Sequence, residues 1–265
     1  MTKIKRILMA LALCSISIGA VACSSNGGGK LSNEEIVNKI EEVSKSVKSS
    51  KANVESKVSF NIGGKDFVTS VKMETEAISE PLKVKVVGKT ETLGKSFDVN
   101  MYITGEDFYL QNIITKEWMH VNDANLKKTL EGRKNSANFD DSVELLNAMQ
   151  KNLKIEDKGS TYEATYSGMD DSVKDTLKKI LSSSQPDAEK VLKNMEIEKL
   201  DIKYVIDKNT FYPTECEIKS VMKVSEAGQD VSFNAEIKFK YSDINQVKEI
   251  VIPDEVKNAK EYKGN

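Results

Sequence analysis

The stretch VSFNAEIKFKY, residues 231–241, decides the fold class of this 265-residue chain. Apolar side chains, among them Phe233 and Ile237, occupy every odd position, and polar or charged side chains stand between them. This two-residue period is that of a β-strand with one buried face and one solvated face. We therefore expect a long strand here, within an antiparallel sheet that is wet on one side.

The same period recurs in two blocks of the chain. Gly63, Gly64 and Gly94 provide turns between neighbouring stretches. The pattern predicts an antiparallel meander in each block. The expected strands lie within residues 54–62, 67–77, 82–86, 97–103, 108–110, 118–121, 162–166, 202–206 and 216–224.

A helix is predicted to begin after Ser32. Ser32 and Glu35 have the spacing of a capping box, and Leu31 and Ile36 stand at the two positions of a hydrophobic staple. The apolar residues that follow recur at helical spacing and leave charged residues outside the stripe. The stripe consists of Ile36, Ile40, Val43 and Val47.

Between the two strand blocks the period becomes helical again. Asp140 or Asp141 is expected to cap one helix, Asp170 a second, and Pro186 to open a shorter third. Apolar stripes support these helices: Val143, Leu146, Met149 and Leu153; Val173, Leu177, Ile180 and Leu181; Val191 and Leu192. We expect one α+β domain over residues 32–265, a broad curved antiparallel sheet with helices packed on its apolar face.

The N-terminus has the features of an export signal. A basic start precedes an uncharged apolar run at residues 7–21, which is short for a membrane span. Residues 20–23, Ala-Val-Ala-Cys, resemble the lipobox of bacterial lipoproteins, in which the cysteine receives the lipid. The sequence thus predicts a signal peptide at residues 1–22, lipidation of Cys23 and a tether at residues 23–31. An ordinary secretory peptide cut after Ala22 is the alternative.

Composition limits the function. Without residues 1–22, 36 Lys and Arg stand against 41 Asp and Glu, a net charge of −5, which disfavours nucleic-acid binding. The strong preference for lysine over arginine favours a Gram-positive source, and we expect the protein at the outer face of the cytoplasmic membrane. Cys216 remains as the single cysteine after Cys23, so no intramolecular disulfide is expected. Its alternation with apolar neighbours predicts a buried, inert thiol rather than a reactive one.

Catalytic patterns are weak. His120 is the single histidine, no serine lies in a GxSxG motif, and no P-loop, EF-hand loop, HExxH or CxxC occurs. The acidic pairs at 140–141 and 170–171 precede helices, where capping explains them. We expect neither an enzyme nor a resident cofactor or metal.

The lipobox, the amphipathic first helix, the long alternating strands and the hairpin VIDKNTFYPTECEIKS, residues 205–220, together resemble the LolA/LolB and LppX-type lipoproteins. That resemblance implies an open half-barrel whose concave apolar face, roofed by helices, holds acyl chains. Soft methionines are suited to such a lining; alternatively the same side chains fill a dry core. The candidate ligand-binding residues are Val71, Met73, Val84, Met101, Leu177, Leu181, Met222, Phe233 and Ile237.

Two functions of different classes follow. The first is a non-enzymatic, membrane-anchored lipoprotein that binds a lipid or other hydrophobic ligand between sheet and helices. The second is a cell-envelope protein that acts on another protein or the wall through its polar surface and has a filled core. An apolar cavity of several hundred Å³ would favour the first. The sequence names no protein partner.

Overall fold

A computed structural model describes residues 31–62, 64–105, 107–122, 140–184, 195–226 and 229–262. Its strands form one 12-stranded sheet that does not close, in the order β12-β6-β5-β4-β3-β2-β1-β11-β10-β9-β8-β7. All neighbouring strands are antiparallel except β12 and β6. The expected fold class, an α+β open half-barrel, is confirmed.

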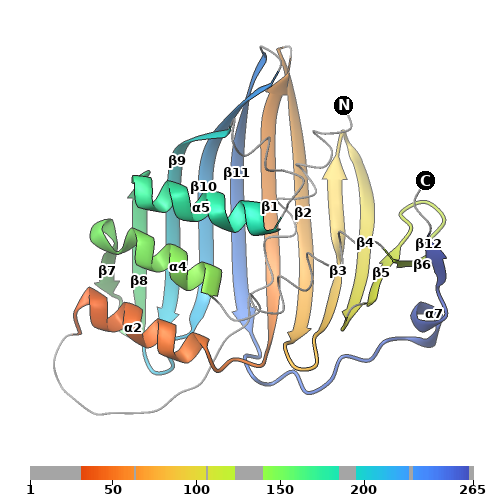
Figure 1. Cartoon of the computed structure of the whole chain (residues 1–265), viewed down its shortest axis with the longest axis horizontal. Coiled ribbons are helices and arrows are strands. Elements are labelled where there is room, and N and C mark those ends of the chain that lie inside the picture. Colours follow the sequence, from red (N-terminus) through yellow and green to blue (C-terminus); the bar gives the residue numbers. More distant parts are fainter. Residues whose placement is uncertain are drawn as a thin grey trace.

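Each strand block of the sequence forms one side of the sheet (Figure 1). The first side consists of β1 (Ser49–Ile62), β2 (Lys65–Ile78), β3 (Lys83–Thr92), β4 (Lys95–Thr104), β5 (Asp107–Gln111) and β6 (Trp118–Val121). The second consists of β7 (Lys154–Asp157), β8 (Thr161–Gly168), β9 (Met195–Asp207), β10 (Pro213–Glu226) and β11 (Gln229–Ser242).

The two sides join at one seam in the middle of the sheet, where β1 pairs with β11. Val54 lies opposite Phe239, and the pairing continues from Lys51 to Phe60. The chain then returns to the first side, because β12 (Lys260–Tyr262) pairs with the outer edge of β6. This last strand and the short β7 were not predicted from the sequence.

Among the described residues, three helices lie on one face of the sheet, which we call the inner face. They are α2 (Asn33–Ser44), α4 (Asp140–Met149) and α5 (Asp171–Ser184). Figure 1 shows them in front of β7 to β11, with α5 reaching β1. No described helix lies in front of β2 to β4. A short helix, α7 (Asp254–Lys257), stands at the opposite margin beside β6.

The capping box of α2 is confirmed. The Ser32 hydroxyl accepts from the Glu35 amide at 3.2 Å, and the Glu35 carboxylate accepts from the Ser32 amide at 2.7 Å. These two bonds satisfy amide groups that a helix start leaves without intrahelical partners. They begin the helix at the predicted place.

The helix before β7 ends earlier than predicted. After Met149 the chain tightens into a 3₁₀ turn, η1 (Gln150–Asn152), and Leu153 has an extended backbone. Leu153 is buried, as expected, but as the entry to β7 and not as a helical residue. Asp170 does stand directly before α5, and its carboxylate accepts hydrogen bonds from Asn152 and Tyr166. The helix predicted at Pro186 falls outside the described residues.

The main core lies between these helices and the second side of the sheet. Val37, Met149 and Val173 supply fully buried helix side chains, and Ile202 and Ile206 of β9 lie against them. A separate small core occupies the other face, which we call the outer face. There, residues after β11, including Ile250 and Val256, cover Tyr102 and Tyr109 of β4 and β5. The sequence did not predict this second core.

Candidate functional site

The candidate site is an apolar strip on the inner face of β2, β3 and β4, which we call the trough. Hairpin register fixes which side chains share this face: Met73 pairs with Gly88, and Gly88 in turn pairs with Val99. The trough therefore lies next to the helix-covered part of the inner face. It comprises Val71, Met73, Ala77, Val84, Val86, Phe97, Val99, Met101 and Ile103.

Burial changes along the trough. At the end near the β2–β3 turn, Val84 and Ile103 are 1% and 4% exposed. Val47, Tyr212 and Ile244, which come from connections between elements, complete the cluster at that end. Toward the β3–β4 hairpin, Met73, Val99 and Phe97 are only partly buried, whereas Val71 on β2 is still 8% exposed. One end of the trough is thus sealed, and the other retains accessible apolar surface.

The inner face beside the seam is packed differently. Rings of Phe233, Phe60 and Phe67 follow one another across β11, β1 and β2, with centroids 5.6 Å and 5.3 Å apart. Leu177 of α5 packs against the cluster that contains these rings and Met222. Such aromatic contacts favour a dense, filled layer.

The predicted ligand-binding residues therefore divide into two groups. The structure places Val71, Met73, Val84 and Met101 in the trough. It places Met222, Phe233 and Leu177 in the cluster under α5, and Ile237 against the main core. The side chain of Leu181, in the last part of α5, and the lipidation site Cys23 fall outside what the structure describes.

Five further residues complete the trough and were not among the predicted ligand-binding residues: Ala77, Val86, Phe97, Val99 and Ile103. The Leu93–Gly94 turn could have indicated part of this set, because it fixes the register of β3 and β4 and so places Val99 opposite Gly88. However, the sequence does not show which part of the sheet the helices cover, so it does not distinguish trough residues from core residues.

The titratable groups of the described chain do not converge on the trough. Cys216 is buried in the main core, and this burial raises the pKa of its thiol to about 12, as expected for an inert cysteine. His120 lies 2.9 Å from Asp107 and stacks on Tyr109, on the outer face. Within the described ranges no three His, Cys, Asp or Glu residues come together as a metal site.

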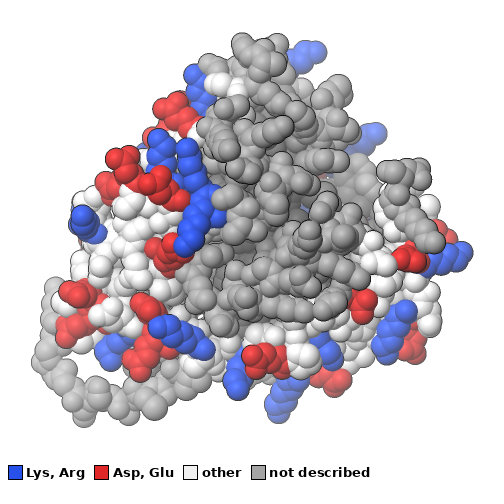
Figure 2. Space-filling model, viewed as in Figure 1, with Lys and Arg blue, Asp and Glu red and all other residues white. Residues whose placement is uncertain are grey.

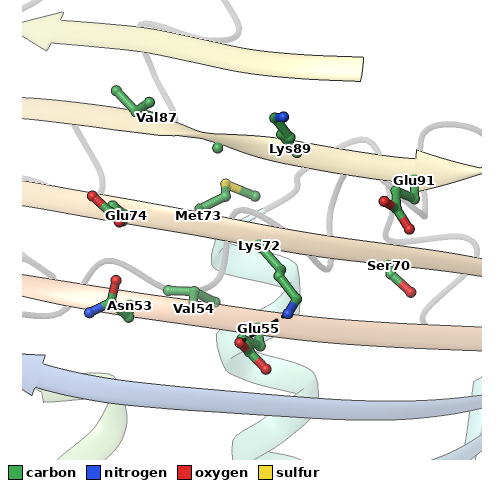
Figure 3. A pocket seen from close by; sticks show the side chains of 11 residues that line it. Asn53, Val54, Glu55, Ser70, Lys72, Met73, Glu74, Val87, Lys89 and Glu91 are labelled. Atoms are coloured by element: carbon green, nitrogen blue, oxygen red, sulfur yellow. Dashed lines mark ion pairs between the residues drawn. The ribbon is translucent and has the colours of Figure 1, made fainter. Parts of the chain in front are cut away.

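A pocket of about 440 Å³ opens on the outer face of β1, β2 and β3 (Figure 3). Charged and polar residues line it together with Val54, Met73 and Val87, and Lys72 forms an ion pair with Glu55 at 3.4 Å across it. At its floor β3 approaches β2 so closely that a Cβ atom on Gly88 would stand 2.2 Å from the Lys72 carbonyl oxygen. This pocket is not the cavity expected between the sheet and the helices, because it opens on the opposite face.

Among the described helices, none has the length and apolar character needed to cross a membrane. Figure 2 shows the helix side of the molecule, where charged side chains stand over the helices and along the lower and right margins. Acidic and basic residues are mixed there, so this view shows no large surface of one sign.

The fold is similar to several solved structures. LprF from Mycobacterium bovis shares 13% sequence identity, with 86% of this chain and 99% of that chain covered and a TM-score of 0.47. Lipovitellin, from a structure concerned with lipid–protein interactions, shares 8% identity over 78% of this chain and 26% of its own, with a TM-score of 0.35. A DUF1329 family protein from Desulfovibrio piger shares 10% identity over 83% and 93%, with a TM-score of 0.23.

Sequence comparison gives one assignment. No curated protein sequence matches the chain. A family model matches residues 32–261, which include every helix and nearly every strand residue described above. The chain belongs to DUF6612, a family of unknown function.

Proposed function

We propose that this protein binds a lipid or another hydrophobic molecule on the inner face of its sheet and catalyses no reaction. The burial gradient of the trough carries the proposal. Its apolar lining continues beyond the strands that described helices cover and, along β4, gains exposure from Ile103 toward Phe97. Met73 and Met101 supply flexible side chains that can adapt to a ligand's shape. An accessible apolar strip beside polar edges is typical of a ligand-binding groove.

We further propose that the protein works at the outer face of the cytoplasmic membrane of a Gram-positive bacterium, attached through a lipid on Cys23. The lipobox-like residues 20–23 and the polar, glycine-rich residues 24–29 support this attachment. Two or three acyl chains would make it stable, whereas one would be marginal.

The first experiment uses residues 30–265, which retain the whole family match without the signal peptide and Cys23. Native mass spectrometry of the purified protein, followed by solvent extraction, should find a bound molecule of lipid mass. Uptake of an uncharged probe, the methyl ester of dansylaminoundecanoic acid, should be saturable. A ligand-free mass together with no probe uptake would refute the proposal.

A matched pair of variants locates the binding site. Val99 lies in the trough on β4, while Val87, 42% exposed, lies on the outer face of the neighbouring strand β3. Val99→Asp should weaken binding of the ester about tenfold or more, since a carboxylate would lose hydration against an apolar chain. Val87→Asp should leave binding unchanged. Equal effects of the two variants would remove the trough from the site.

A cell-envelope protein that acts through its polar surface is the second candidate. One observation favours it: a pocket with several charged lining residues, including Glu55, Lys72 and Lys89, opens on the outer face of the sheet. For this function the probe experiments should show no uptake. Crosslinking on intact cells should then capture a specific protein through residues around Lys72 and Lys89, two exposed pocket residues.

A further inference from the structure

The inner face changes character where the trough meets the β3–β4 hairpin. Thr69 of β2 pairs with Thr92 of β3, and Thr92 pairs with Lys95 of β4. These three side chains therefore form one row across the open end of the trough. Thr90 stands one step inside the row, between Val71 and Phe97. The apolar lining thus ends in hydroxyl groups and an amine.

The two threonine hydroxyls in this row contact each other. The Oγ1 atoms of Thr69 and Thr92 lie 3.1 Å apart, so one hydroxyl donates to the other. Because each hydroxyl carries one proton, the accepting hydroxyl keeps its proton for another acceptor. No described residue takes that proton. The pair can therefore donate one hydrogen bond to a ligand at the end of the trough.

The charges of these strands are divided between the two faces. Lys95 is exposed on the inner side and forms no ion pair within the described ranges. On the outer face, by contrast, Lys116 lies 2.9 Å from Asp98 and Lys72 lies 3.4 Å from Glu55. The acidic residues of β3 and β4 occupy positions on the outer face.

In the described strands, one acidic residue at this end of the sheet occupies a position on the inner face, but it lies on a distant strand. Glu226 pairs with Gln229 at the end of β10, and strands β11 and β1 separate β10 from β2. The row of Thr69, Thr92 and Lys95 consequently has local positive charge and hydrogen-bond donors without a neighbouring carboxylate on its own strands.

We propose that the trough binds an amphiphile with an anionic head group, whose apolar chain points toward Val84 and whose head lies at Thr92 and Lys95. This inference rests on the proposed function and adds the chemical class and orientation of the ligand. A carboxylate or a phosphate is an acceptor that matches an ammonium and a hydroxyl donor. From Ile103 to Phe97 the apolar lining of β4 runs about 20 Å, enough for an extended acyl segment.

The test compares two probes with the same chain, dansylaminoundecanoic acid and its methyl ester, of which only the acid carries a negative charge. Wild-type residues 30–265 should bind the acid about two- to fivefold more tightly than the ester, the scale of one exposed ion pair. Lys95→Gln should remove this preference and leave ester binding unchanged. Thr92→Val should reduce the preference in part, because one hydroxyl of the pair remains.

The matched control is Lys89→Gln, which removes an exposed lysine from the outer face of β3 (Figure 3). It should leave the affinities for both probes unchanged. If Lys89→Gln and Lys95→Gln lower acid binding equally, the preference arises from overall charge and the assigned head-group site is wrong.

The remaining outcomes separate this inference from the proposed function. If wild type binds ester and acid equally, hydrophobic binding stands and the anionic head group is refuted. If it binds neither probe, both proposals fail. Inorganic phosphate alone should not displace the acid, because the chain supplies most of the affinity; displacement by phosphate would indicate a free-anion site and overturn the assignment of an amphiphile.

Discussion

The two sides of the sheet share one sequence pattern and differ in what covers it. On the second side, inner-face residues of β8 to β11 meet helix side chains such as Met149 and Val173, neither of which is exposed at all. On the first side, the inner face of β2 to β4 has no described helix in front of it, and its burial falls from Val84 toward Phe97. Alternation thus determines which side chains share a face. The helices determine whether that face becomes core or accessible surface.

The largest effect should come from removing one methionine on each side. Met149→Ala opens a cavity in a fully enclosed site and should lower the free energy of unfolding by about 2–5 kcal/mol. Met73→Ala, in the partly exposed trough, should cost ~1 kcal/mol, because solvent or neighbouring groups can fill the space. Urea unfolding of residues 30–265 measures both. Equal losses would mean that the two sides are packed alike.

The pH dependence of stability tests how well Cys216 is buried on the helix-covered side. Burial raises the pKa of its thiol from 9.0 to about 12. In the unfolded chain the thiol ionises first, so unfolding releases a proton and the native state loses stability as pH rises from 9 toward 12. The slope contributed is at most about 1.4 kcal/mol per pH unit. Urea unfolding at pH 9 and 10 should show this loss in wild type and a smaller one in Cys216→Ala.

Thiol chemistry provides a second measurement at the same residue. In residues 30–265 Cys216 is the single cysteine. At pH 8 an aromatic disulfide reagent should label the native protein slowly and the guanidinium-unfolded protein at once. Rapid labelling of the native protein would show that the helices open readily and that the covered side is less closed than the structure indicates.

The smallest effect should come from the start of α2. Ser32→Ala removes the hydroxyl that accepts from the Glu35 amide and should cost ~1 kcal/mol of stability. Ser96→Ala, an exposed position on β4, serves as the control and should change stability by less than ~0.5 kcal/mol. A larger loss for Ser96 than for Ser32 would contradict the importance of helix cover on the second side.

Most of the fold was accessible from local patterns. The alternation of residues 231–241 and the Ser32–Glu35 spacing predicted β11 and α2 because burial and capping act on neighbouring residues. The short strands β7 and β12 escaped prediction, since three or four residues carry too little periodicity. The core formed by Ile250 and Tyr102 also escaped, because it joins residues distant in the chain.

The candidate site was predicted by face and not by position on the sheet. Met73, Val84 and Met101 were correctly assigned to one apolar face. Met222 and Phe233 share that face but lie in a separate cluster under α5. Their separation depends on where the helices rest, and this follows from tertiary packing that a periodic pattern does not encode.

The seam between β1 and β11 has a consequence for folding kinetics. Each side of the sheet is built mainly from hairpins between consecutive strands, but Val54 must find Phe239 across more than half of the chain. Contacts of such high sequence separation slow folding, because the chain loses the entropy of closing a long loop before these contacts stabilise it. We therefore expect the two hairpin arrays to form early and the seam late. Until residue 242 has been synthesised the seam has no complete partner, so the sheet reaches its full width only after nearly the whole chain has been made.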